Sequence, residues 1–149
     1  MPVMEVSRFL RFFRVAAELD VDKNDLKRYN DFIDDKLYDL LLRGQANAKA
    51  NGRDIMEPFD LPITKGLQES IHQFRVLDEE VELQPILQQI ATYPPLDATP
   101  SEETDSRLPE IVGGLSLALA RTFKIIEPDR KNPQTEQWTR VQQIFDLLL

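Results

Sequence analysis

The chain has 149 residues, enough for one compact domain or two small intertwined ones, and 26 acidic against 18 basic residues give it a formal net charge of −8. The absence of cysteine excludes disulfides, thiol nucleophiles and cysteine-based zinc sites, and a single histidine excludes most other transition-metal sites. No apolar run approaches the ~18 residues that a membrane span needs and the N-terminus has no signal-peptide pattern, so we expect a cytoplasmic protein.

The first half of the chain has the periodicity of three helices. Apolar residues recur on one face over residues 9–19, and the acidic turn at 20–22 predicts capping of a second helix. That second helix is long, over about residues 23–51, and Asn51-Gly52 is typical of a left-handed closing turn. A proline-containing connection follows. A third apolar stripe is then formed by Leu67, Ile71, Phe74 and Leu77.

The second half repeats the order of a short, a long and a short helix. Residues 83–90 predict a short helix, and Ser101 with the acids after it predicts the start of a long helix that reaches about residue 126. Asn132 and Pro133 are a favourable N-cap and first position for the last helix. No segment has the sustained alternation of a strand, so none is predicted. The apolar stripe of the last helix is Trp138, Val141, Ile144, Phe145 and Leu148.

Two adjacent glycines lie inside the second long helix. Gly113 and Gly114 each cost a helix about 1 kcal/mol relative to alanine, and a close crossing of the two long helices would explain that cost. The functional alternative is a serine nucleophile at Ser116. This alternative fails because Ala118 stands where a nucleophile elbow has glycine, and because no strand precedes the turn.

The other patterns of polar residues predict neither a catalytic site nor a metal site. Residues 20–31 carry oxygens at calcium-loop spacing, but Asp25 and Asp31 stand where the loop requires glycine and glutamate, so helix capping explains them better. We expect His72 to be a partly buried packing residue. Acidic pairs are expected to be solvated, because neighbouring helical positions point in different directions. The sequence therefore predicts no catalytic residue, no metal site, no cofactor and no small-molecule substrate. The acidic pairs are Asp34-Asp35, Glu79-Glu80 and Glu102-Glu103.

The segment 47–55, followed by Asp60 and Leu61, resembles the end of a histone central helix, its second loop and the start of its third helix. Over its whole length the chain resembles a small bacterial family of uncharacterised function in which one polypeptide carries two histone folds. The motifs LYDLL at 37–41 and DLPITKGLQ at 60–68 are specific to that family. The resemblance implies an all-α histone fold.

The same resemblance implies that two helix-loop-long helix-loop-helix units pack as a single-chain pseudodimer around one shared core. Residues 1–78 would form the first unit and residues 79–149 a second, divergent unit. An ion pair between Arg53 and Asp60 would fasten the second loop to the third helix. Bidentate arginine–carboxylate contact suits that role, because it fixes a loop that has few other contacts.

In histone dimers the first loop of one unit lies beside the second loop of its partner, making two ends that touch phosphate. The resemblance would place Lys23 with Arg130 and Lys131 at one end. Arg53 would lie at the other end, with Ser101, Glu102 and Glu103. Only the first end could be cationic. The simpler interpretation of Arg130-Lys131 is a solvated turn.

Departures from the histone pattern and the charge distribution both bear on whether the chain binds DNA. Ile55 replaces the expected threonine, Pro62 interrupts the third helix, and the second half lacks a Gly-Arg motif. Residues 1–76 carry 12 basic and 13 acidic side chains, and residues 77–149 carry 6 and 13. DNA binding requires cations that displace counterions from phosphates, so this charge balance disfavours it.

Two hypotheses remain from the sequence. The first is a non-enzymatic histone-like protein that serves as a protein-interaction or dimerisation module for a protein partner or another copy of itself. The second is a nucleoid-associated DNA-binding protein with one weakly cationic end. Fold analogy alone carries the second hypothesis.

Overall fold

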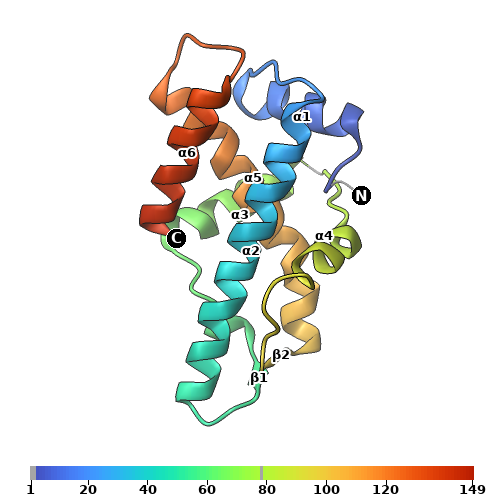
Figure 1. Cartoon of the computed structure of the whole chain (residues 1–149), viewed down its shortest axis with the longest axis vertical. Coiled ribbons are helices and arrows are strands. Elements are labelled where there is room, and N and C mark those ends of the chain that lie inside the picture. The colour runs from blue at the N-terminus through green and yellow to red at the C-terminus, as the bar shows by residue number, and fades with distance from the viewer. Residues whose placement is uncertain (1–2, 78) are drawn as a thin grey trace.

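The computed structural model describes residues 3–77 and 79–149, and helices carry nearly all of its regular structure (Figure 1). The all-α prediction is confirmed, and the order of a short, a long and a short helix occurs twice. In chain order the elements are α1 (Val6–Ala17), α2 (Asp25–Ala50), β1 (Ile55–Met56), a 3-10 turn η1 (Pro58–Asp60), α3 (Lys65–Leu77), α4 (Leu83–Ile90), β2 (Thr99–Pro100), α5 (Glu102–Ile126) and α6 (Thr135–Leu148).

Local capping chemistry sets the bounds of α2. The carboxylate of Asp22 accepts the backbone N–H groups of Asn24 at 2.7 Å and Asp25 at 3.2 Å, so the helix begins at Asp25. At the other end Gly52 has φ of +72° and donates its N–H to the Lys49 carbonyl at 3.0 Å. The predicted closing turn is therefore present, with glycine rather than Asn51 in the left-handed conformation.

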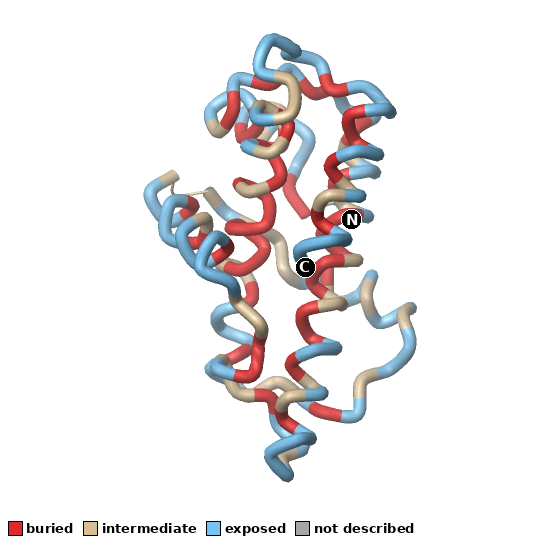
Figure 2. The backbone as a smooth tube through the Cα atoms, turned by 90° about the vertical axis from the view of Figure 1, so that its left-hand side faces the viewer, coloured by how far each residue is buried: buried red, intermediate tan, exposed pale blue. Residues whose placement is uncertain are grey.

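The core lies between the two long helices and the helices that cover them (Figure 2). Phe9 and Phe13 of α1 pack on the ring of Tyr29 in α2, with centroids 5.2 and 5.7 Å away. The Tyr29 hydroxyl and the hydroxyl of Ser116 in α5 lie 2.6 Å apart in the buried interior. Ser116 also donates to the carbonyl of Val112, so its hydroxyl is a buried structural link between helices rather than an accessible nucleophile.

The glycine pair in α5 has a different cause from the one expected. A Cβ added at Gly113 would collide with the ring of Phe74, and one at Gly114 would lie 3.0 Å from the backbone nitrogen of Ile71. Both neighbours belong to α3. Our expectation that the two long helices cross at these glycines is wrong, because α3 is the helix that lies against this part of α5.

Two other local predictions are also wrong. The strands β1 and β2 pair in parallel, with Ile55 opposite Thr99. Each has two residues, too few to show a strand periodicity in the sequence. The last helix begins at Thr135 instead of Pro133, because the side chain of Gln137 accepts the N–H of Gln134 at 2.8 Å and so makes Gln134 the N-cap.

Candidate functional site

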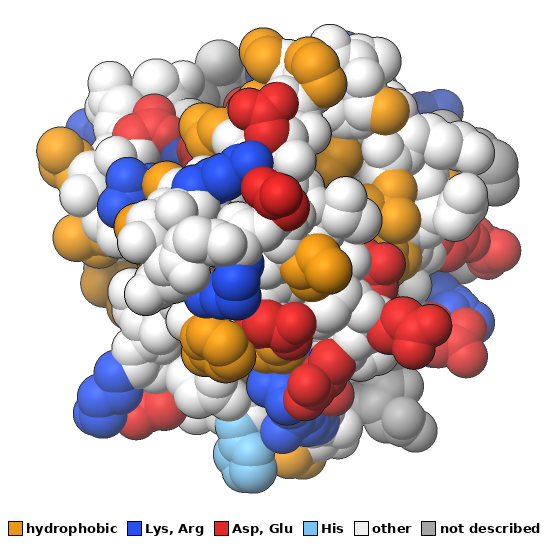
Figure 3. Space-filling view, turned by 90° about the horizontal axis from the view of Figure 1, so that it is seen from below, with side chains coloured by type: hydrophobic (Ala, Val, Ile, Leu, Met, Phe, Trp, Pro, Cys, Tyr) orange, Lys and Arg blue, Asp and Glu red, His pale blue; other side chains and the backbone are white. Residues whose placement is uncertain are grey.

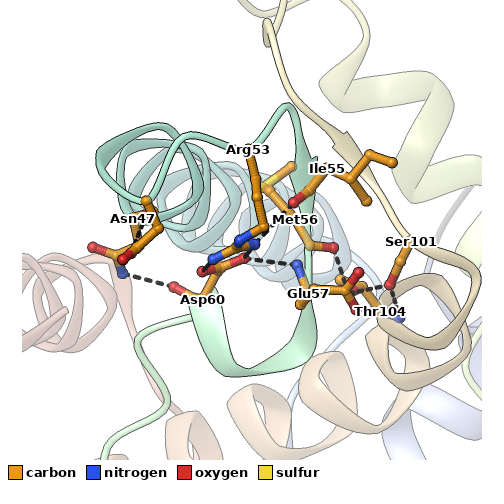
Figure 4. Close-up of polar contacts among 9 residues, drawn as sticks. Asn47, Arg53, Ile55, Met56, Glu57, Asp60, Ser101 and Thr104 are labelled. Carbon is orange, nitrogen blue, oxygen red and sulfur yellow. Dashed lines mark hydrogen bonds and ion pairs between the residues drawn. The ribbon is translucent and has the colours of Figure 1, made fainter.

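The paired loops at the two ends of the molecule are the places where the resemblance to histones implied contact with phosphate. At one end the β1–β2 pair joins the loop after α2 to the loop before α5. Ser101 donates its N–H to the carbonyl of Met56 at 2.9 Å, and the Thr104 hydroxyl donates to the same oxygen at 2.8 Å. The structure therefore brings the Arg53 loop beside Ser101 (Figure 4).

Arg53 and Asp60 form a bidentate ion pair at this end. The guanidinium donates Nη1 to Oδ2 at 2.6 Å and Nη2 to Oδ1 at 2.7 Å. The buried carboxylate also accepts the N–H of Glu57 at 2.8 Å, and the amide of Asn47 donates to the Asp60 carbonyl at 2.7 Å. The hydrogen bonds from Arg53 are the main cause that lowers the pKa of Asp60, and the backbone bond from Glu57 adds to it. Together with the bond from Asn47 of α2 and the one that Arg53 donates to the Ile55 carbonyl at 3.1 Å, the pair joins α2, β1 and the 3-10 turn.

This ion pair leaves little free positive charge for phosphate. Both terminal nitrogens of Arg53 are bonded to Asp60, and the ring of Phe59 lies 5.1 Å from the guanidinium carbon. Acidic and basic side chains are interspersed on the face seen from this end (Figure 3). Five exposed acids lie near the paired strands, and two of them are paired with cations, Asp54 with Lys49 and Glu103 with Arg107, each at 2.7 Å. The five are Asp54, Asp97, Glu102, Glu103 and Asp105, which leaves three of them without an ion pair among the described residues.

At the opposite end the loop after α1 lies beside the loop after α5. The N–H of Asp20 donates to the Lys131 carbonyl at 2.8 Å, which places the Lys23 loop next to the loop that carries Arg130 and Lys131. Arg130 is bonded to Glu127 at 2.7 Å, and this bond is the first cause of the lowered pKa of Glu127. Within the described residues, Lys23 and Lys131 make no ion pair. The structure thus brings the predicted cations together, with Arg130 already neutralised by a neighbour.

Sequence reasoning missed the burial of three charged residues on α2, which are Asp25, Asp34 and Lys36. Asp34 is 3% exposed, so the expectation that the Asp34-Asp35 pair is solvated is wrong for Asp34. Burial first, and then the carboxylates of Asp31 and Asp35, raise the pKa of Asp34 to about 7. Lys36 is 2% exposed. Its position three residues after Ile33, on the apolar stripe of α2, was the signal that could have identified it as buried.

The remaining candidates are His72, on α3, and the oxygen-bearing residues around the start of α2. His72 is exposed rather than partly buried, so the packing role expected for it is wrong. Residues 25–31 lie within α2, as helix capping rather than a calcium loop predicts. In residues 3–77 and 79–149, no cluster of three acidic or histidine side chains is arranged to hold a metal ion. Across the same residues, every helix is too short or too polar to span a bilayer.

Comparisons with known proteins place the chain among relatives of similar length. It matches the DUF1931 family, described as a domain of unknown function, over residues 9–146. A protein from Aquifex aeolicus (strain VF5) is 30% identical over 135 residues, which cover 91% of this chain and 78% of that protein.

Among solved structures, a protein from Thermus thermophilus is 52% identical with a TM-score of 0.93, covering 99% of both chains. A protein from Aquifex aeolicus is 27% identical with a TM-score of 0.78, covering 96% of this chain and 94% of that one. The histone from Methanopyrus kandleri is 14% identical with a TM-score of 0.59, covering 93% and 92%. At that identity the last likeness shows the fold alone, which is the histone fold. With the match over residues 9–146, this chain belongs to the DUF1931 family.

Proposed function

We propose that this chain is a non-enzymatic histone-like protein that binds another protein through its acidic surface. The observation that carries the proposal is the bidentate bond between Arg53 and Asp60, which removes the strongest candidate phosphate ligand from the paired-strand end. Exposed acids then dominate that end. An acidic helical surface attracts a partner with cationic groups and repels nucleic acid.

The proposal includes the organisation of the chain. Residues 1–78 and 79–149 form the two histone-fold units, and the buried contact between Tyr29 and Ser116 supports a core that both units share. A pseudodimer of this kind already satisfies the dimer interface within one polypeptide. The surfaces left for partners are therefore the outer faces, including the acidic paired-strand end.

A second candidate function is DNA binding through the end that holds Lys23, Arg130 and Lys131, in which case the protein would lie on the nucleoid. The adjacency of the two loops, bonded from Asp20 to Lys131, favours it. Against it, Glu127 neutralises Arg130 and the net charge is −8. A few cations at one end would support weak, salt-sensitive contact rather than wrapping.

Fluorescence anisotropy with labelled duplex DNA separates the two functions. The intact protein is titrated at low and at physiological salt beside the variant K23E/R130E/K131E. We expect no binding of the wild-type protein even at low salt. Binding that weakens steeply with salt and disappears in the variant would overturn the protein-binding proposal in favour of DNA.

A positive test uses photo-crosslinking in cells. A photoreactive phenylalanine derivative is placed at Asp97, on the acidic end, and at Gln143 on α6 as a matched control. Discrete protein adducts from position 97, absent from position 143 and reduced by Glu102→Lys, are expected. Equal adducts from both positions would contradict the proposed surface.

A further inference from the structure

An apolar groove of about 460 Å³ lies where three helices meet, away from both paired-loop ends. Its walls come from the start of α3, the C-terminal part of α5 and the C-terminal turns of α6, which lie close together in Figure 1. Leu67 and Phe145 are buried at the groove. Ile125 and Leu148 also line it, although they are 77% and 73% exposed. The volume is within the range of small-molecule sites, about 300 to 1,000 Å³.

One cation faces this apolar lining. Among the described residues that line the groove, Arg121 has the only charged side chain. Its guanidinium donates to the neutral side chain of Gln73 and makes no ion pair with a described carboxylate. This is unusual for the chain, because nine of its eleven arginines do form ion pairs within the described residues. In a protein of net charge −8, an uncompensated arginine beside an apolar groove is a specific feature.

Uncharged polar groups line the same groove as Arg121. The Ser70 hydroxyl belongs to the α3 wall of the groove. The groove also includes Gly66 in the first turn of α3, where a Cβ would meet no atom within 4 Å. Helix N-termini favour negative charge, so the α3 wall favours a negatively charged ligand, as Arg121 does.

We propose that this groove binds a free linear aliphatic carboxylate, with the alkyl chain on the apolar lining and the carboxylate on Arg121. Charge complementarity selects this occupant. One guanidinium at a mainly apolar groove, whose other polar side chains are uncharged, matches a ligand with one negative head and an apolar body. The sequence predicted no small-molecule site because the lining residues come from segments around 64–70, 118–125 and 144–149, which only folding brings together.

Calorimetric titration of the intact protein with octanoate, decanoate and dodecanoate, each below its micellar concentration, tests the proposal. We expect saturable binding at one site, tightening about threefold to fourfold per added methylene until the groove is filled. Arg121→Gln should weaken decanoate binding about tenfold or more, the effect of losing one charge-assisted contact. Arg107→Gln, on the same helix but bonded to Glu103 away from the groove, is the matched control and should bind as the wild type does.

Two further measurements distinguish other occupants. The uncharged dye Nile red should bind wild type and Arg121→Gln alike, whereas Ala118→Phe, which places a ring in the groove, should bind neither dye nor decanoate. Absence of saturable binding, or equal affinity for decanoate in the wild type and Arg121→Gln, would overturn the proposal. So would sedimentation of the wild type as a dimer that Ala118→Phe converts to a monomer, because a second copy would then fill the groove. If Ala118→Phe does not fold, the affinities of Arg121→Gln and Arg107→Gln for decanoate test the proposal without it.

Discussion

The ammonium group of Lys36, in the middle of α2, is bonded to the carboxylate of Asp146 near the end of α6. Lys36 is 2% exposed, and a second carboxylate, on Asp39, lies 3.8 Å from it. The bond acts beside an aromatic contact in which the rings of Phe32 and Phe145 lie 4.9 Å apart at 82°. Together these contacts attach the last helix to the first long helix.

Removing the partner of Lys36 should destabilise the fold. In Asp146→Asn the buried ammonium loses its closest anion, and we expect a loss of about 1 to 3 kcal/mol in the free energy of unfolding, because half of the Asp146 side chain is solvated. The double variant Lys36→Met, Asp146→Asn should recover most of this loss. Urea denaturation measures both. Lys65→Met, which removes a 91% exposed lysine, is the control and should stay within about 0.5 kcal/mol of the wild type. A double variant less stable than Asp146→Asn would contradict the explanation.

The raised pKa of Asp34 should make stability depend on pH. Because its pKa is about 7 in the folded protein and about 3.9 in an unfolded chain, the native state binds the extra proton between these values. The resulting stability is fully present below about pH 4 and is lost as the pH rises to 7. Asp34→Asn should therefore be more stable than the wild type by about 1 to 3 kcal/mol at pH 7.5, and nearly equal to it at pH 4.

Urea denaturation at pH 4, 6 and 7.5 checks this dependence on pH. The charged groups of Asp31, Lys23 and Lys27 line the same hollow as Asp34, so the difference between variant and wild type is the quantity to follow. The exposed Asp105→Asn is the control and should show no such trend. An Asp34→Asn variant that is equally stabilised at all three pH values would show that the Asp34 carboxylate does not titrate in this range.

Most of the fold could be predicted from the sequence because helix ends and apolar stripes are local signals. Asp22, Gly52 and Ser101 each end or begin a helix through bonds to residues within three positions, and these ends were predicted within two residues. The β1–β2 pair was missed because its partners, Ile55 and Thr99, are far apart in the chain and too few to form a pattern.

The wrong predictions about the candidate site also concern contacts between segments that are far apart in the chain. Burial of Asp34 and Lys36 depends on which helices cover α2, and periodicity along α2 indicates at most which side of the helix faces the core, as it does for Lys36. Asp34 was expected to be solvated because it belongs to an acidic pair whose two side chains point in different directions on a helix. The groove at Arg121 likewise depends on three helices at once. Properties that arise from tertiary contact need the fold before they can be assigned.

Gly114 should not tolerate alanine. In an ordinary helix interior this change stabilises a protein by about 0.5 to 1 kcal/mol, but here the new methyl group would press on the backbone of Ile71 in α3. We expect Gly114→Ala to lower the free energy of unfolding by about 1 to 3 kcal/mol. Gly66→Ala in α3 is the matched control, because its Cβ would enter open space and should stabilise the protein by about 0.5 to 1 kcal/mol. Thermal and urea denaturation of the two variants should therefore shift in opposite directions, and a shift in the same direction would remove α3 packing as the reason for the glycine.

The first half of the chain should not fold alone. In the intact protein Gly113 and Gly114 of α5 receive α3, and Ser116 of α5 holds the hydroxyl of Tyr29, so both α2 and α3 expose apolar surface when α5 is absent. A fragment of residues 1–76 should therefore be largely unfolded, or helical only as an oligomer, by circular dichroism and sedimentation. Mixing it with residues 77–149 should restore a cooperative thermal transition, because the second fragment supplies the missing half of the core. A cooperative transition from the first fragment as a monomer would show that residues 1–78 contain a complete core, and would contradict the shared-core organisation.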